Sequence, residues 1–249
     1  ADVHLDPSAP ERQEGLEEVL SLADDEAVDL VTIGGDLFDS EVAAEDLRDS
    51  LRELFSGREY PILTIPGNHD ADAFRGNLVF GENFEPATDE PFHHVPVADG
   101  AARVTCLPYT PQATDDLLID LADREPFDGP EALLLHCSLE APIKGGVGDE
   151  GEQRYFPIST EALAGLDFEY YLAGHYHATH RTELSNDGTF VYPGTPASVT
   201  RSETQRRTAA LIDTEASQTV RLQPLDTFHY DELRQRVTPG NEAAVIETI

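Results

Sequence analysis

The alternation of apolar, strand-like runs with amphipathic helical stretches is the feature that most restricts the fold of this chain. Residues 11–24 place Leu16, Val19 and Leu20 at helical spacing, and the apolar run 27–33 that follows is typical of a buried strand. Residues 41–55 repeat the helical pattern, and the run 60–65 again reads as a strand. Strands that alternate with helices predict a mostly parallel central sheet with helices on its faces.

The pattern changes in the second half of the chain. Residues 71–100 mix Gly, Pro, Asn and Asp, which predicts a short helix and an irregular excursion. Further strands are predicted at 102–109, 131–138 and 168–175, with a helix over 113–122. From His180 onward, short strands separated by turns are predicted at 180–185, 189–194, 208–214 and 219–225. An α/β half followed by an antiparallel half predicts two stacked sheets flanked by helices.

The charge balance is strongly acidic. Asp and Glu number 49 against 16 Lys and Arg, for a formal net charge of −33, and Met and Trp are absent. The acidic residues are spread through sequence with regular apolar periods, which predicts a folded acidic surface and resembles proteins of halophilic archaea. In molar salt the Debye length falls to about 3 Å, so repulsion across such a surface is screened.

Two further observations bear on the compartment. No apolar run approaches the roughly 20 residues of a transmembrane helix, so we expect a protein without membrane contact. Cys106 and Cys137 lie in apolar surroundings, which fits buried free thiols in a reducing cytoplasm better than a disulfide.

Each predicted strand ends in polar groups that a core would not tolerate without cause. They are Asp2 and His4, Asp36, Asn68 with His69 and Asp70, His136, and His175 with His177. The carboxyl ends of parallel strands are where open α/β sheets assemble their sites. Residues two apart in a strand point to the same side, so Asp2 with His4, and His175 with His177, can each aim two ligands at one point.

The residue types indicate a metal centre. Oxygen and imidazole ligands without thiolate suit Mn²⁺, Fe or Zn²⁺. Seven candidates are too many for one ion but enough for two ions that share a carboxylate, which is the clamp used in phosphoryl chemistry.

The ordered motifs resemble a known family. The set D-x-H, G-D-x-x-D, G-N-H-D, a lone His after an apolar strand, and G-H-x-H is similar to that of the calcineurin-like metallophosphoesterases. Within that superfamily the wording "DVHLD", "GGDLFD", "LPYTP" and "YPGTPASVTRSE" is most similar to the SbcD-type DNA double-strand-break repair exonucleases. The resemblance implies a four-layer α-β-β-α sandwich over residues 1–225, with 226–249 as a tail or the start of a reduced or truncated cap.

The resemblance also implies which residues bind the two divalent ions, most plausibly Mn²⁺. One ion would be held by Asp2, His4, Asp36 and His177. The second would be held by Asp36, Asn68, His136 and His175, with Asp36 as the bridge.

Other roles follow from the same resemblance. His69 would approach the phosphate and assist the leaving oxygen, and Asp39 would orient it. An equally weighted reading makes Asp39 only a helix cap beside Ser40. Asp70 would have a structural hydrogen-bonding role. His180 has no counterpart in the ligand pattern and is expected to begin an exposed strand.

Arg201, Arg206 and Arg207 form the only basic cluster in the sequence. They would either meet a nucleic-acid backbone, with Arg201 as a substrate-binding residue, or pair with nearby acids. Repair nucleases of this type also pair through helices after G-N-H-D and work with a coiled-coil ATPase. A homodimer and such an ATPase partner are therefore expectations here.

Three functions remain open from the sequence. The first is a metal-dependent nuclease of the DNA-repair type, and the second is a small-molecule phosphodiesterase or phosphatase on the same scaffold. The charge of −33 opposes a polyanionic substrate, although salt screening and bound cations would reduce that opposition. The third is a scaffold subunit with a degenerate site, against which the complete set of candidate ligands argues.

Overall fold

The computed structural model describes residues 2–74, 79–143, 154–216 and 219–234. Its first half is an α/β unit. The elements are α1 (Pro10–Asp25), β1 (Val31–Ile33), α2 (Glu41–Phe55), β2 (Ile62–Thr64) and β3 (Phe84–Pro86). The three strands form a parallel sheet in the order β1-β2-β3. The helix α2 begins at its predicted residue because the Ser40 hydroxyl accepts a hydrogen bond from the Ala43 N–H.

The second half is built on a larger mixed sheet. Its strands are β4 (His93–Val97), β5 (Ala102–Cys106), β6 (Glu131–His136), β9 (Tyr170–Gly174), β10 (His180–Glu183) and β11 (Thr189–Tyr192). Their order in the sheet is β10-β11-β9-β6-β5-β4. The remaining elements are η1 (Ala98–Gly100), α3 (Asp115–Ala122), α4 (Thr160–Ala164) and the strand pairs β7 (Ser138–Leu139) with β8 (Pro157–Ile158) and β12 (Thr208–Ile212) with β13 (Val220–Pro224).

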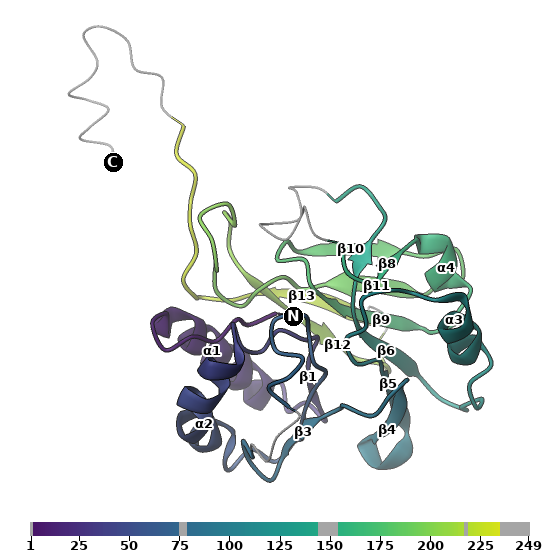
Figure 1. Cartoon of the computed structure of the whole chain (residues 1–249), viewed down its shortest axis with the longest axis horizontal. Helices are drawn as coiled ribbons and strands as arrows, with labels where there is room; N and C mark the ends of the chain where they lie inside the picture. The colour runs from purple at the N-terminus through teal and green to yellow at the C-terminus, as the bar shows by residue number, and fades with distance from the viewer. Residues whose placement is uncertain (1, 75–78, 144–153, 217–218, 235–249) are drawn as a thin grey trace, which may run out of the picture.

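Three hydrophobic clusters hold the layers together. One packs α1 and α2 against the small sheet, and another packs α3 and α4 against the large sheet. A third cluster lies between the two sheets. Neighbouring residues of one strand divide between clusters: Leu133 faces the helices, whereas Leu134 faces the other sheet. Figure 1 shows α1 and α2 on one side of the strands and α3 and α4 on the other. The predicted arrangement of two stacked sheets flanked by helices is therefore confirmed.

Two expectations are not met by the described residues. Among those of 71–100 there is no α-helix, and residues 75–78 lie outside the described residues. The excursion instead supplies β3 and β4, with the short η1 turn between β4 and β5. Phe84 of β3 stacks on Phe55 in the core, at 5.1 Å between ring centroids. Tertiary packing therefore determines the secondary structure of a segment whose local sequence is irregular. The expected first strand is also missing, since residues 2–5 contribute only an isolated bridge from Leu5 to Phe38.

The segment after β13 returns to the body of the protein. The Phe228 carbonyl accepts from the Ser198 N–H, and Tyr230 forms a bridge with Thr204. Residues 235–249 of the predicted tail lie outside the described residues. Within the described residues, no helix is both long enough and apolar enough to cross a membrane. The division at residue 225 stays a prediction.

Candidate metal centre

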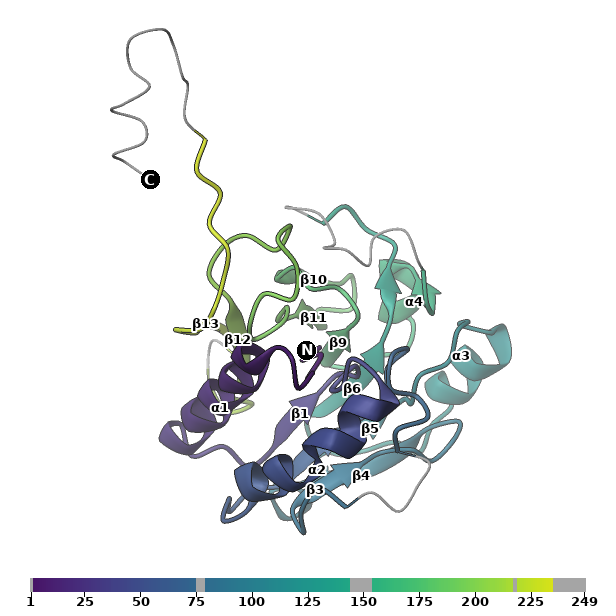
Figure 2. The ribbon, with the colours of Figure 1, turned by 60° about the vertical axis from the view of Figure 1, so that its left-hand side comes forward.

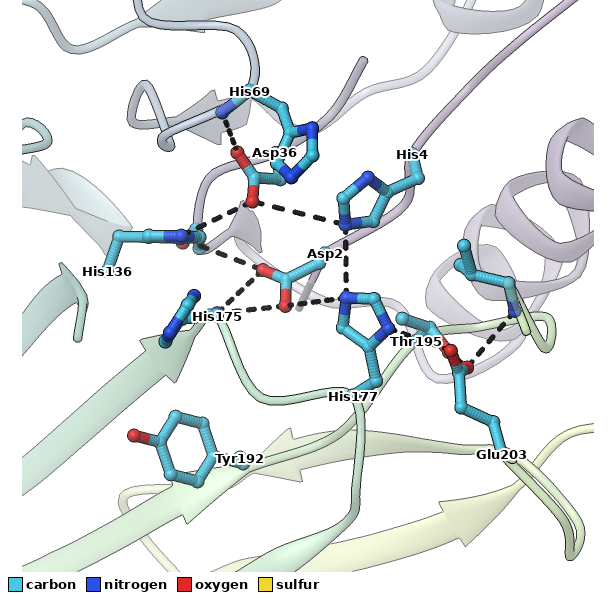
Figure 3. Close-up of polar contacts among 12 residues, drawn as sticks. Asp2, His4, Asp36, His69, His136, His175, His177, Tyr192, Thr195 and Glu203 are labelled. Carbon is cyan, nitrogen blue, oxygen red and sulfur yellow. Dashed lines mark hydrogen bonds and ion pairs between the residues drawn. The ribbon is translucent and has the colours of Figure 1, made fainter. Parts of the chain in front are cut away.

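Four candidate ligands, Asp36, Asn68, His175 and His177, lie in turns that follow strands. His136 ends β6, and Asp2 and His4 lie in the N-terminal segment before α1. Several of these positions have left-handed backbone. His4, Asp36 and His175 have φ values of 53°, 48° and 97°. Such values are uncommon for residues other than glycine and concentrate at functional sites. The same-face argument from strand geometry therefore does not explain how His175 and His177 are aimed. The chain turns after Gly174, and both imidazoles still reach the shared centre seen in Figure 3.

The N-terminal segment is tied to the turn after β1. The N–H groups of Val3 and His4 both donate to the Asp36 carbonyl, each at 2.9 Å. Both carboxylate oxygens of Asp2 accept from the His175 N–H, at 2.9 and 2.8 Å. These bonds place residues from three distant parts of the sequence around one point. Figure 2 shows the purple N-terminal segment running from α1 toward β9.

The ring Nε2 atoms of three histidines face that point. His4 Nε2 lies 3.0 Å from His177 Nε2, and His136 Nε2 lies 2.8 Å from Asn68 Oδ1 and 3.3 Å from Asp36 Oδ2. The Asp36 carboxylate reaches both sides of the cluster, because the same oxygen lies 3.9 Å from His4 Nε2. Carboxylate oxygens of Asp2 lie 3.7 Å from His136 Nδ1 and 3.9 Å from His177 Nε2.

In two of these rings the opposite nitrogen is held by an acceptor: His136 Nδ1 lies 2.9 Å from the Gly34 carbonyl, and His177 Nδ1 lies 2.8 Å from Glu203 Oε1. His4 Nδ1 lies 3.3 Å from Asp39 Oδ1 but makes no hydrogen bond among the described residues. An acceptor at Nδ1 stabilises the tautomer that leaves Nε2 with its lone pair. That arrangement is the usual support of a metal-binding histidine.

The donor atoms fit divalent ions. Two nitrogens that each lie 2.0–2.1 Å from one ion are separated by about 3 Å, and the His4 and His177 Nε2 atoms have this separation. Oxygen and nitrogen donors of Asp2, Asp36 and His136 also lie within 4.8 Å of one another. Asp2, His4, Asp36, His136, His175 and His177 are buried, and Asn68 is half-buried. The structure thus brings the seven predicted ligands together, with the His175 ring 5.2 Å from the His136 ring between centroids.

Burial and neighbouring charges shift the pKa values of Asp36 and His136 in opposite directions. Burial alone would raise the pKa of Asp36, but His136, His4 and the His69 N–H hold it well below its usual range. Burial alone would lower the pKa of His136, but Asp36 and Asp2 raise it to about 9. The centre is therefore an interdependent set of positive and negative groups.

His69 and Asp39 lie at the edge of the centre. The exposed His69 donates its backbone N–H to Asp36 Oδ1 at 2.8 Å, and its ring meets the His4 ring edge-on at 4.8 Å between centroids. Ligand atoms of His4, Asp39 and His69 lie within 4.8 Å of one another. The cap reading of Asp39 was wrong, because Ser40 is the residue that caps α2. The contact of Asp39 with His4, and its ion pair with Arg12 at 3.4 Å, were not expected.

Asp70 lies behind the ligands. Its two oxygens accept from the Gly67 N–H at 2.7 Å and from the Phe38 N–H at 3.2 Å. Burial, followed by the nearby Asp36 charge, raises the pKa of Asp70 to about 7. The predicted structural role of Asp70 is confirmed, since it joins the G-N-H-D turn to the turn after β1.

The three arginines of the predicted basic cluster lie in different environments. Arg207 is buried, donates to the carbonyls of His177 and Thr195, and lies 3.7 Å from Glu203. Arg206 donates to the Leu225 carbonyl. Arg201 is exposed. The pairing interpretation thus describes Arg207, whereas a substrate contact by Arg201 stays a prediction. His180 does begin β10, but it is half-buried.

Sequence reasoning missed several residues around the centre. Glu203 is buried against His177. It ends the quoted "YPGTPASVTRSE" wording, but it was given no role. Tyr109 and Tyr155 bring their rings 5.7 Å apart, beside His136 and His175 respectively. Tyr109 lay within the quoted "LPYTP" wording, which was the one available signal.

Comparison with known proteins agrees with this arrangement. The sequence model of one family, described as calcineurin-like phosphoesterase, matches residues 1–179. The chain belongs to the calcineurin-like phosphoesterase family. This phosphoesterase is thus placed among hydrolases that use a dinuclear site of divalent metal ions.

One solved structure with a TM-score above 0.5 shows the same fold. A dimetal phosphatase from Danio rerio is 10% identical, with a TM-score of 0.53 and coverage of 86% of each chain. The phosphopantetheinyl hydrolase of Mycobacterium tuberculosis is 15% identical, with a TM-score of 0.41, and the match covers 67% of this chain and 79% of that one. At these identities the likeness concerns the architecture of this phosphoesterase and not its substrate.

Proposed function

We propose that this phosphoesterase hydrolyses phosphodiester bonds with two divalent metal ions, most plausibly Mn²⁺. The observation that carries the proposal is the convergence of three Nε2 atoms on the Asp2 and Asp36 carboxylates, with the Nδ1 atoms of His136 and His177 held by acceptors. Six of the seven side chains are buried, and burying so many charged or ionisable groups together is costly unless they are paired or bind metal.

The ligand sets follow from the position of Asp36. Its carboxylate lies between the His4 side and the His136 side of the centre. One ion would be held by Asp2, His4, Asp36 and His177, and the other by Asp36, Asn68, His136 and His175. When bound, the pair supplies Lewis acidity that activates water and neutralises the charge of a phosphate.

His69 would supply the proton that the leaving oxygen needs. Its exposed side chain stands beside His4, while its backbone is fixed to Asp36. The Asp39 carboxylate, within 4.8 Å of both rings, favours the protonated form of His69. His69 thus has the exposure of a group that meets substrate, and Asp39 would orient and charge it.

Two substrate classes remain candidates. The resemblance of the motifs to DNA repair exonucleases supports a DNA substrate in the cytoplasm. Arg207 is buried, and Arg206 is exposed but donates to the Leu225 carbonyl. These internal contacts leave little basic surface for a long polyanion, which favours a small phosphodiester or phosphomonoester. The net charge of −33 also opposes long nucleic acids.

The test compares both substrates under controlled metal. Purified protein in molar KCl is stripped with chelator, re-supplied with Mn²⁺, Fe²⁺ or Zn²⁺, and assayed on linear DNA and on a chromogenic phosphodiester. We expect turnover only with added metal, and we expect Asp36→Asn to abolish it because both ions lose a ligand. Undiminished turnover by stripped protein, or by Asp36→Asn at saturating metal, would refute the dimetal mechanism.

A further inference from the structure

Glu203 is a buried acid in the loop between β11 and β12. Only 5% of its surface is exposed, in a chain whose acids are mostly on the surface. Its side chain points toward His177 (Figure 3). A carboxylate in this position must be stabilised by hydrogen bonds, because burying an unpaired charge is strongly unfavourable.

The loop around Glu203 provides those hydrogen bonds. Oε2 accepts from the Thr195 hydroxyl and the Val199 N–H, both at 3.0 Å. Oε1 accepts from the Thr200 N–H at 3.1 Å and from the Thr200 hydroxyl at 3.2 Å. Arg207 adds a positive charge 3.7 Å from Oε2. The loop is therefore folded around an ionised carboxylate.

Oε1 of Glu203 also forms a hydrogen bond with His177. Its Nδ1 lies 2.8 Å away, the shortest contact that the Glu203 carboxylate makes with a donor among the described residues. Arg207 holds the same histidine from a second direction, because its guanidinium donates to the His177 carbonyl. Both the ring and the backbone of His177 are thus tied to this loop.

A second buried glutamate, Glu131, shows how this arrangement differs from a buried ion pair that only stabilises the fold. Glu131 is equally buried, at 7% exposed, and it pairs with Arg103 and Arg124. Neither arginine is among the candidate ligands. The Glu131 cluster holds elements together, whereas the Glu203 cluster ends on a histidine whose other nitrogen faces the metal centre.

We infer that Glu203 is a positioning residue for the metal centre: it holds His177 in the Nδ1–H tautomer and so directs the Nε2 lone pair at one ion. This inference rests on the proposed dinuclear site. It extends the site beyond the seven ligands to the loop 193–207. The inference also predicts that Glu203 strengthens binding of the ion held by His177. The affinity for the ion held by His136 and His175 should not depend on Glu203.

The test is metal binding by Glu203→Gln. The Gln amide keeps the shape of the side chain but removes its charge, and it opposes an N–H₂ group to the donors of Thr195 or Thr200. Free Mn²⁺ is measured by electron paramagnetic resonance during titration of metal-stripped protein in molar KCl. We expect one of two Mn²⁺ ions to bind about 10- to 100-fold more weakly, and the other to bind within about threefold of wild type.

Two controls accompany this variant. Ser198→Ala removes a hydrogen bond of 2.7 Å to the Glu203 backbone carbonyl in the same loop without touching the carboxylate. Glu131→Gln removes a buried charge elsewhere. Both should lower the melting temperature of the stripped protein while leaving both Mn²⁺ affinities unchanged.

The outcomes are distinct. Glu203→Gln with both affinities unchanged, or with both weakened equally, would overturn the positioning role. Wild-type protein that binds fewer than two Mn²⁺ ions would instead refute the proposed function. If Glu203→Gln does not fold, the wild-type protein loaded with Zn²⁺ provides the test by ¹⁵N NMR of its imidazoles. His177 should then appear as the Nδ1–H tautomer with a slowly exchanging proton, and its absence would overturn the inference.

Discussion

Replacing Gly67 with alanine should displace the bridging carboxylate of Asp36. A Cβ at Gly67 would lie 2.1 Å from Asp36 Oδ1 and 2.4 Å from the Asp36 backbone nitrogen. Gly67 does not have a positive φ, so the methyl group meets a steric conflict without added backbone strain. The Gly67 N–H is also fixed by Asp70 at 2.7 Å, which limits retreat of the residue itself.

The size of the effect follows from these distances. Ordinary van der Waals contact begins at 3.4 Å, so the carboxylate must retreat by at least about 1 Å, a displacement that can cost about 10²-fold in rate. Oδ1 would also lose its hydrogen bond of 2.8 Å from the His69 N–H, which fixes the proposed proton donor. We therefore expect kcat to fall by about 10²-fold or more, and crowding of the core to cost about 1–3 kcal/mol of unfolding free energy.

The assay is turnover of a chromogenic phosphodiester at saturating Mn²⁺, with metal content and melting temperature measured on the same preparation. Gly165→Ala is the matched control, because the new Cβ would approach no atom closer than 3.3 Å and the site lies elsewhere. Its kcat should equal that of wild type. If Gly67→Ala retained kcat within about threefold at full metal content, the reasoning from carboxylate position would be refuted.

Two further predictions concern catalysis and stability. His69→Ala should keep both metal ions and lower turnover by about 10²–10⁴, because a positioned proton donor acts in the transition state; elemental analysis beside the rate checks this, and loss of one ion per chain would make His69 a ligand instead. The melting temperature should rise from dilute buffer to molar KCl, because salt screens repulsion among 49 acidic residues; a melting temperature that is flat or falls with salt would contradict the halophilic interpretation.

Regular elements were predictable where local and tertiary preferences agree. The helix over residues 41–55 was predicted at the bounds it adopts, since its apolar spacing and the Ser40 cap act together. The strands β6 and β9 were visible as apolar runs because both of their faces are buried. β3 and β4 were missed, because their burial depends on side chains that arrive from distant segments.

The candidate site was likewise predictable only in part. Its ligand types were visible at strand ends, but the left-handed turns at His4, Asp36 and His175 were not, since nothing local in those residues requires positive φ. Glu203 lies at the end of the quoted "YPGTPASVTRSE" wording, but nothing in that wording indicates its role. Its significance arises from a contact with a residue 26 positions away, made inside the folded loop.

The ties between the two ends of the described chain have a consequence for how the protein is made. Asp2 is fixed by the N–H of a residue 173 positions later in the sequence, and His177 is fixed by Glu203 beyond that. Ribosomes deliver the N-terminal ligands first, and these must wait until the last strands have emerged. A nascent chain that ends before residue 203 would therefore lack the contacts of Asp2 and His177 described above, so loading of the proposed centre with metal would follow the emergence of these segments and the formation of their long-range contacts.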